Sequence, residues 1–347
     1  METDLEGTQK NSLKRYLWML FRVGLAGGIV WFLISRHLAD FKLGLARFNY
    51  WWLIPAALAY YAHMLYCSVR WYRVAALINV KMSLAESFWV TMQSYFWTLV
   101  IPGGAIGGDV ARLAIVSKRQ PAGSKVEGVF TIIMDRIIGM VALFALTIVL
   151  VLLAWNQLIN VSIEGVELSR GFKVLGIVGL LLMCLFGIAA MLALFCHRPL
   201  LRISLFARIF EWCNRRAHGT LDRLIAATDV YARNWKALIV LTFNSVFLVH
   251  LMTAVAMLFL ICGLGVTPID VLGVFTALTI GNIAGLIPFT VSGIGLRDIT
   301  VLALLQATDM GGNLSVIPIL YTGLVIVTHL SCSLFFVTDH RIICKKG

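Results

Sequence analysis

Three places in the sequence join an acidic residue to an arginine within or beside strongly apolar stretches. The residues concerned are Asp109, Arg112, Asp135, Arg136, Arg297 and Asp298. Because a charge at bilayer depth costs roughly 2.5–3.5 kcal/mol on insertion scales, the equal number of acids and arginines predicts that they pair with one another. Asp135 and Arg136 are also consistent with structural anchoring near the inner membrane surface.

Two of these places follow glycine-rich breaks in apolar segments. The glycines are Gly103, Gly104, Gly107 and Gly108 at the first break and Gly293 and Gly295 at the second. Exposed backbone N–H groups and a helix N-terminus at such a break form an anion site. An arginine beside that site suits a phosphate, which a guanidinium binds through two parallel hydrogen bonds. We therefore predict that the breaks, with Arg112 and Arg297, bind the phosphate of a substrate, and that Asp109 and Asp298 pair with these arginines or with a cationic part of the headgroup.

Polar residues inside the predicted helices are weaker candidates. Asn282 is a candidate for lining a transport pathway, although residues of this type more often form hydrogen bonds between helices. His63 and His250 are interpreted as helix-packing residues for the same reason.

Motifs for catalysis, metal binding and cofactors are missing from the sequence. It has no Ser-His-Asp spacing, no HExxH, no CxxC and no phosphate loop ending in GK[ST]. The seven cysteines lack metal-ligand spacing, and most lie in apolar runs, where they act as small hydrophobic residues. The longest polar stretch, 197–236, is too short for a catalytic domain. We expect a protein that is not an enzyme and holds neither metal nor cofactor.

The composition is that of a protein embedded in a bilayer. Of its 347 residues, 60% are hydrophobic and 13% are charged, whereas soluble domains carry about 25% charged residues. The mean hydropathy is +0.89. Apolar runs such as 140–155 are unbroken and do not alternate with polar residues, which favours helices over a β-barrel. We predict an all-α integral membrane protein that forms a single transmembrane domain over 1–347.

Six apolar segments are predicted to be full transmembrane helices, because about 20 residues are needed to cross the hydrocarbon core. They are 16–35, 51–69, 130–155, 174–196, 237–264 and 314–337.

Two further apolar segments end at the glycine-rich breaks. If 84–101 crossed the membrane fully, the basic residues that follow it would lie outside, against the usual bias of Lys and Arg. We therefore predict a re-entrant hairpin over 84–117 on the inner side. By the same logic, 271–307 forms a second hairpin on the outer side. Non-helical backbone at that depth must be buried in protein or line a wet cavity.

The net charge of +12 is interpreted through topology and not through nucleic acid. Excess Lys and Arg is typical of cytoplasmic loops. We place the basic segments 70–81, 112–125 and 197–236 inside, together with both chain termini. The loop 36–49 carries three cations and is the one exception. Apolar residues recur at helical spacing in 197–236, so this linker is predicted to be partly an amphipathic helix on the inner surface.

The two halves of the chain share a pattern. Pro102 precedes Gly107 at the same spacing as Pro288 precedes Gly293. The first half, about 16–155, reads helix, helix, inner hairpin and helix. The second, about 174–337, repeats this order with every direction reversed. That is typical of an inverted-topology repeat with a substrate site near the midplane. The alternative is two unrelated loops, since Gly and Pro are common in transmembrane helices.

Three motifs resemble those of a known family. They are the Pro-Gly-Gly-x-x-Gly-Gly-Asp-x-x-Arg run of 102–112, the Asp-Arg-Ile-Ile-Gly start of 135–139 and the Pro-x-x-x-x-Gly-x-Gly-x-Arg-Asp run of 288–298. Over about 10–340 the chain resembles the transmembrane domain of lysylphosphatidylglycerol synthase/flippase proteins. It departs at 289–292, where that family tends to have a further Pro-Gly-Gly.

The resemblance implies lipid translocation. In two-part members this domain is similar to a lipid flippase, and a separate soluble C-terminal domain makes the aminoacyl lipid. No such domain is present before Gly347, so the resemblance argues against aminoacyl transfer. It carries a substrate role onto the six paired residues that match the motifs, namely Asp109, Arg112, Asp135, Arg136, Arg297 and Asp298.

We therefore expect a multi-pass flippase of the bacterial inner membrane. Its substrate would be a phosphate-bearing lipid: a phospholipid, an aminoacyl phospholipid or a polyprenyl-phosphate-linked lipid. The alternatives are a membrane-embedded enzyme, an accessory subunit of an envelope lipid or glycan pathway, and a small-solute transporter. Expected partners are membrane lipids and no nucleic acid, with a homo-oligomer and a partner enzyme left open. Proton coupling through Asp109 or Asp298 is a further hypothesis.

Overall fold

The computed structural model of the chain describes most of its predicted membrane-embedded part. The described residues are 38–101, 105–119, 125–161, 169–196, 208, 211–212, 214–216, 220–287, 295–308, 310–311 and 314–336. Within these ranges the regular structure is helical and contains no β-strand. This agrees with the predicted all-α class. The predicted first helix, 16–35, and the two chain ends lie outside the described residues.

The described helices follow one another along the chain. They are α2 (Leu38–Arg47), α3 (Leu53–Leu77), α4 (Leu84–Val100), α5 (Ala105–Arg119), α6 (Lys125–Leu153), α7 (Trp155–Asn160), α8 (Arg170–Ala193), α11 (Thr220–Arg233), α12 (Trp235–Ser245), α13 (Met252–Gly263), α14 (Val271–Ala284), α15 (Leu296–Gln306) and α16 (Ile317–Ser331). A π-helical turn, Val246–Leu251, joins α12 to α13, so that the two run as one long helix.

Four of the described helices are long and apolar enough to cross a membrane. They span Lys125–Leu153, Arg170–Ala193, Trp235–Gly263 and Leu314–Phe336, and each corresponds to a predicted span. Helix α3 covers the predicted span 51–69 and has 25 residues, about 37 Å at the usual rise of 1.5 Å per residue. It is more polar than these four, because it carries His63, Arg70 and Arg73.

Helix starts are fixed by side-chain caps where the sequence supplies them. The Ser83 hydroxyl accepts a hydrogen bond from the Glu86 amide at 3.0 Å and begins α4. The Asp270 carboxylate accepts from the Gly273 amide at 2.9 Å and begins α14. Such caps satisfy N–H groups that have no partner within the helix.

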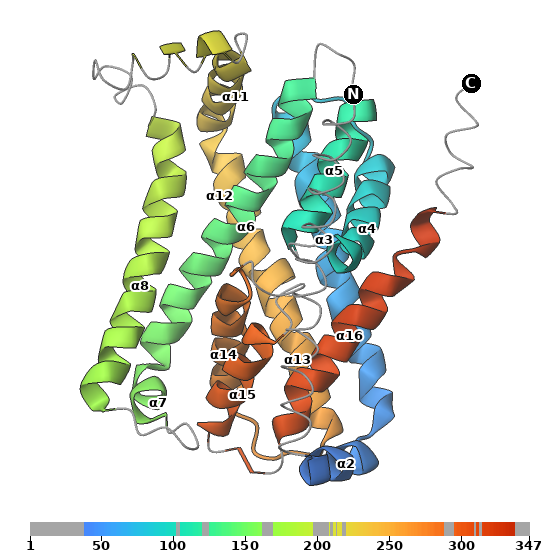
Figure 1. The fold of residues 1–347 in the computed structure, drawn as a ribbon, viewed down its shortest axis with the longest axis vertical. Coiled ribbons are helices and arrows are strands. Elements are labelled where there is room, and N and C mark those ends of the chain that lie inside the picture. The colour runs from blue at the N-terminus through green and yellow to red at the C-terminus, as the bar shows by residue number, and fades with distance from the viewer. Residues whose placement is uncertain are drawn as a thin grey trace, which may run out of the picture.

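Two pairs of shorter helices accompany the long spans. Helix α4 packs along α5, and α14 packs along α15. Figure 1 shows the first pair in the upper half of the molecule and the second pair in the lower half, with α3, α13 and α16 between and beside them. The breaks that precede α5 and α15 include 102–104 and 288–294, which lie outside the described residues.

The main apolar core lies between the two halves. It contains buried side chains of α3, α4, α13, α14, α15 and α16, among them Met64, Met257, Leu278, Leu305 and Ile317. Helix α8 lies at the edge of the bundle against α6 (Figure 1), and its Phe186 is 76% exposed. An exposed apolar side chain of this kind suits contact with lipid hydrocarbon.

The close contact of α4 with α5 depends on glycine. A Cβ on Gly108 would lie 2.7 Å from the carbonyl oxygen of Ser94 and 2.6 Å from the Thr98 methyl group. A Cβ on Gly107 would lie 2.5 Å from the carbonyl oxygen of Ile101. Because neither backbone oxygen can move easily, only glycine lets α5 approach α4 this closely.

Candidate functional site

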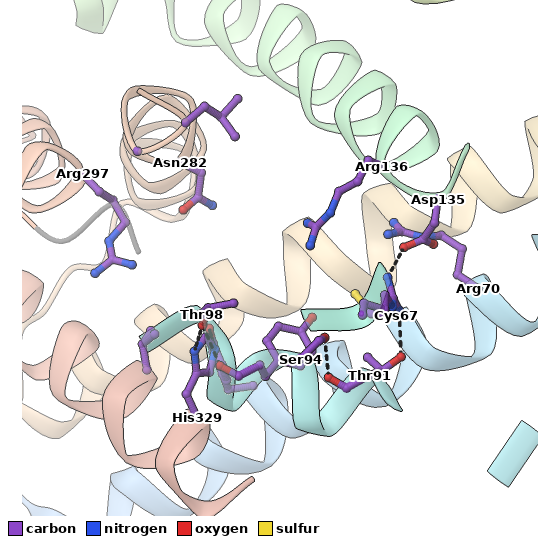
Figure 2. A pocket seen from close by; sticks show the side chains of 16 residues that line it. Cys67, Arg70, Thr91, Ser94, Thr98, Asp135, Arg136, Asn282, Arg297 and His329 are labelled. Atoms are coloured by element: carbon purple, nitrogen blue, oxygen red, sulfur yellow. Dashed lines mark hydrogen bonds and ion pairs between the residues drawn. The ribbon is translucent and has the colours of Figure 1, made fainter. Parts of the chain in front are cut away.

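A polar cavity of about 210 Å³ lies where the two helix pairs approach each other. Figure 2 shows Arg297 and Asn282 on one side of it and Arg136 and Asp135 on the other. Its wall is formed by residues of α3, α4, α5, α6, α14, α15 and α16 together with the turn after α14. Segments from both halves of the sequence therefore meet in one cavity.

Asp135 on α6 is the buried anion of this cavity, with 2% of its surface exposed. One carboxylate oxygen accepts from Arg70 Nε at 2.7 Å, and the other accepts from an Arg112 terminal nitrogen at 3.2 Å. Arg70 also donates to the Ser245 hydroxyl at 3.1 Å. A single carboxylate thus faces two guanidinium groups, one on α3 and one on α5.

Arg112 is the less neutralised of these two arginines. It donates to Thr91 on α4 at 2.8 Å, and its guanidinium lies 4.0 Å from the ring centroid of Trp71. Only 3% of the residue is exposed, yet its Nε has no hydrogen-bond partner among the described residues. Since a buried unpaired donor is costly, this guanidinium is well prepared to receive an anion.

Arg136 and Asp109 form a second ion pair between α6 and α5. Arg136 Nε lies 2.6 Å from one Asp109 oxygen, and an Arg136 terminal nitrogen donates to the other at 2.7 Å. The Arg136 side chain is 43% exposed. This pair is more accessible to solvent than the Arg70–Asp135 and Arg297–Asp298 pairs.

Arg297 and Asp298 form a third ion pair at the start of α15. Two Arg297 nitrogens donate to Asp298 Oδ1 at 3.0 and 2.9 Å. The Thr322 hydroxyl on α16 contacts both residues. Gly295 takes φ of +99°, a conformation that favours glycine, and its amide donates to Asp298 Oδ2 at 3.0 Å. Asp298 therefore both caps α15 and holds Arg297.

The arginines and carboxylates of this site do not balance. Arg70, Arg112, Arg136 and Arg297 line the cavity, and their carboxylate partners are Asp109, Asp135 and Asp298. Among these paired groups one positive charge remains. Because buried charge without a counter-ion is unfavourable, the cavity is electrostatically suited to a monoanion.

Histidine and hydroxyl groups form a hydrogen-bonded network at the cavity, in which His329 lines the wall and His63 does not. The His329 ring on α16 lies 3.2 Å from the Tyr60 hydroxyl and 2.9 Å from the Thr98 hydroxyl. The His63 ring lies 3.3 Å from the Tyr95 hydroxyl and 2.8 Å from the Tyr60 carbonyl oxygen. These contacts join α3, α4 and α16 beside the arginines.

The structure brings most of the predicted site residues together. Arg112, Asp135, Arg136, Asn282 and Arg297 line the cavity, while Asp109 and Asp298 are ion-paired to two of them. The described glycines have structural roles: Gly107 and Gly108 allow the close α4–α5 contact, and Gly295 begins α15. The predicted glycines Gly103, Gly104 and Gly293 lie outside the described residues.

Sequence reasoning missed several residues of the wall. Arg70 begins the basic segment 70–81 that the sequence places on the inner side, yet its side chain is buried and bonded to Asp135. His329, Tyr60, Tyr95 and Thr98 also line the cavity, and the sequence did not single them out. One signal in the sequence could have identified Arg70. This arginine follows His63 by two helical turns in an apolar segment, and ionisable residues within such segments are often functional.

Within the described ranges, no group of three or more His, Cys, Asp and Glu side chains is arranged to hold a metal ion. Comparison with protein families gives one finding: the family described as "Lysylphosphatidylglycerol synthase TM region" matches residues 19–331. The match covers all of the cavity-lining residues. Neither the curated proteins nor the solved structures that were compared gave a match.

Proposed function

The chain belongs to the lysylphosphatidylglycerol synthase transmembrane-region family, and from this premise we propose that it is a lipid flippase. It carries a phosphate-bearing lipid between the two leaflets of a membrane and does not alter the lipid chemically. The observation that carries this proposal is the cavity whose ion-paired arginines exceed their carboxylates by one charge.

A phosphate headgroup fits the chemistry of this cavity. Guanidinium groups bind phosphate oxygens through paired, charge-assisted hydrogen bonds. Arg112 and Arg297 approach the cavity from α5 and α15, and both are more than nine-tenths buried. In so desolvated a place an anion interacts with arginine much more strongly than in water.

The arrangement of the helix pairs supports a transport mechanism. The α4–α5 and α14–α15 pairs lie in opposite halves of the molecule (Figure 1), and both contribute side chains to one cavity. We assign them to the two members of an inverted-topology repeat, whose halves rock about the central site and open it to each side in turn. The hydrocarbon chains of the lipid remain in the bilayer while the headgroup crosses.

The proposal includes a place in the cell. The substrate lipids make the bacterial inner membrane the expected location, with both chain termini on the cytoplasmic side. The family, the four long apolar helices and the charged cavity support a multi-pass transporter. We assign the guanidinium, imidazole, hydroxyl and carboxylate groups of the wall to ligand binding and propose no catalytic step.

The test is a headgroup-translocation assay in proteoliposomes. Fluorescent anionic, zwitterionic and aminoacylated phospholipids and a polyprenyl phosphate are compared for wild type, Arg112→Ala, Arg297→Ala and a matched control, Arg233→Ala. Arg233 is an exposed cation on α11, away from the cavity.

We expect wild type and the Arg233 variant to move at least one phosphate-bearing lipid, and the two cavity variants to lose most of that rate while remaining folded. If no lipid moves under any ion gradient, the flippase proposal is wrong. An accessory or enzymatic part in lipid metabolism then becomes the better explanation.

A further inference from the structure

His329 occupies a position in the cavity wall at which a proton can be bound next to the substrate anion. The residue is 5% exposed and lines the cavity together with Arg297. It has hydrogen-bonding groups at both ring nitrogens: the Thr98 hydroxyl at Nδ1 and the Tyr60 hydroxyl at Nε2. Figure 2 shows the ring directed at Thr98.

The hydrogen-bond network fixes which nitrogen carries the hydrogen. Thr98 donates its hydroxyl hydrogen to the Tyr95 carbonyl oxygen at 2.6 Å, so towards His329 it acts as an acceptor. His329 therefore carries its hydrogen on Nδ1, and Nε2 accepts from the Tyr60 hydroxyl. Nε2 is therefore the nitrogen that can bind a proton. The Tyr60 hydroxyl must then rotate so that its oxygen accepts a hydrogen bond from Nε2–H.

His63, one helical turn after Tyr60 on α3, is hydrogen-bonded in the same way as His329. Its Nδ1 donates to the Tyr60 carbonyl oxygen at 2.8 Å, and its Nε2 accepts from the Tyr95 hydroxyl at 3.3 Å. Tyr60 and Tyr95 thus each hold an imidazole through its basic nitrogen. His63 is absent from the cavity lining, whereas His329 belongs to it, which selects His329 as the site nearest the substrate.

The charges around His329 connect proton binding to anion binding. The ionisable groups that face it are Tyr60 and His63 on α3, Tyr95 on α4 and Arg297 on α15. Its own segment also carries Tyr321 and Cys332. Helix α13, which also packs against α16, contributes apolar side chains such as Met257 and Leu260 to the shared core. Arg297 is the permanent cation of this set, and its charge opposes an imidazolium in an empty cavity.

We propose that His329 binds a proton together with the anionic headgroup, so that a proton is a co-substrate of the transporter. This inference rests on the proposed function. The anion reduces the repulsion between Arg297 and a protonated ring, and by linkage the protonated ring strengthens anion binding. The proton comes from water, adds to Nε2 as the headgroup enters, and returns to water when the headgroup leaves. No other bond is made or broken.

The carboxylates are less suited to this role. Asp109 is held by two nitrogens of Arg136, and Asp298 is held by Arg297, Thr322 and the Gly295 amide. Protonation of either carboxylate would break these bonds. The structure therefore favours His329 over the Asp109 or Asp298 coupling that the sequence suggests.

The experiment is calorimetric titration of the full-length protein in detergent with dihexanoyl phosphatidylglycerol, a water-soluble monoanionic phosphodiester lipid. Titrations near neutral pH in buffers of different ionisation enthalpy give the number of protons taken up on binding. The variants are His329→Gln, Thr98→Val and the control His250→Gln. The control removes a partly buried imidazole that bonds to the Gly139 carbonyl oxygen and does not line the cavity.

We expect fractional proton uptake in wild type and in the His250 variant, and binding without uptake in the His329 variant. Within the pH range in which uptake approaches one proton, wild-type affinity falls about tenfold for each pH unit, and above that range the proton on His329 no longer affects it. If the His329 variant does not fold, Thr98→Val gives the answer. This substitution removes the hydroxyl that accepts from Nδ1–H of His329. Because a protonated ring depends on that acceptor more than a neutral ring does, we expect the proton uptake at a given pH to fall.

The outcomes separate this inference from the function on which it rests. Wild-type binding without proton uptake, or uptake unchanged in both the His329 and Thr98 variants, overturns the proton site and leaves the flippase proposal standing. Absence of binding by any phosphate-bearing lipid, together with absence of translocation, overturns the flippase proposal and the proton site with it.

Discussion

Arg70 and Asp135, which are 65 residues apart in the sequence, are joined by a hydrogen bond of 2.7 Å from Arg70 Nε to Asp135 Oδ1. Both side chains are nearly inaccessible, with 5% and 3% of their surfaces exposed. The bond ties α3 to α6 at the level of the cavity. Arg112 reaches the other oxygen of the same carboxylate at the longer distance of 3.2 Å.

This difference in distance predicts that the two arginines have different tasks. Arg70→Gln removes the closer counter-ion of Asp135, and breaking a buried pair costs about 3–5 kcal/mol. Arg112→Gln leaves Asp135 paired with Arg70, so we expect a smaller loss of stability but a larger loss of anion binding. Thermal unfolding in detergent and titration with a short-chain anionic lipid measure the two effects. Equal losses of stability in both variants would contradict the assignment.

Gly108 allows a second prediction, about the α4–α5 contact. In Gly108→Ala the new methyl group would lie 2.7 Å from the Ser94 carbonyl oxygen, and overpacking of this kind costs about 1–3 kcal/mol. The matched control is Gly179→Ala on α8, where a Cβ meets nothing within 4 Å. We expect the control to change stability by less than about 1 kcal/mol. A Gly108 variant as stable as the control would show that α5 can withdraw from α4.

The sequence predicted the architecture well where apolar length decides the structure. Four predicted spans correspond to helices long and apolar enough to cross a membrane, since a helix is the simplest way to satisfy backbone hydrogen bonds in hydrocarbon. The segments 84–117 and 271–307 form the helix pairs α4–α5 and α14–α15. Whether these pairs form an inverted repeat stays a prediction.

The partners within the site could not be predicted to the same degree. Spacing along the chain suggests local pairing, and this holds for Arg297 and Asp298. It does not hold for Asp135, which pairs with Arg70 and Arg112, or for Asp109, which pairs with Arg136 on the next helix. These partners depend on how helices rotate against one another, and a single sequence gives no measure of that rotation.

The Arg136–Asp109 pair leads to a third prediction. With 43% of the Arg136 side chain exposed, a double-mutant cycle over Arg136→Gln and Asp109→Asn should give a coupling energy of no more than about 1 kcal/mol. Asp109→Asn also removes one negative charge from the site, so anionic lipids should bind more tightly, whereas Arg112→Gln weakens their binding. Lipid titrations at low and high salt measure both effects. Weaker binding by the Asp109 variant would mean that the carboxylate itself contacts the substrate.

Asn282 provides the sharpest test of the charge in the cavity, because it lines the cavity opposite Arg136 and Asp135 (Figure 2). Asn282→Asp has nearly the same shape but cancels the one surplus positive charge of the site. We expect affinity for an anionic lipid to fall at least about tenfold, or about 1.4 kcal/mol. Asn282→Gln keeps the site cationic and serves as the control, with only a small steric effect. If the substrate is bound through its phosphate, the two variants must differ, and the difference must shrink for a zwitterionic lipid. Equal affinities in both variants would mean that the headgroup is held elsewhere.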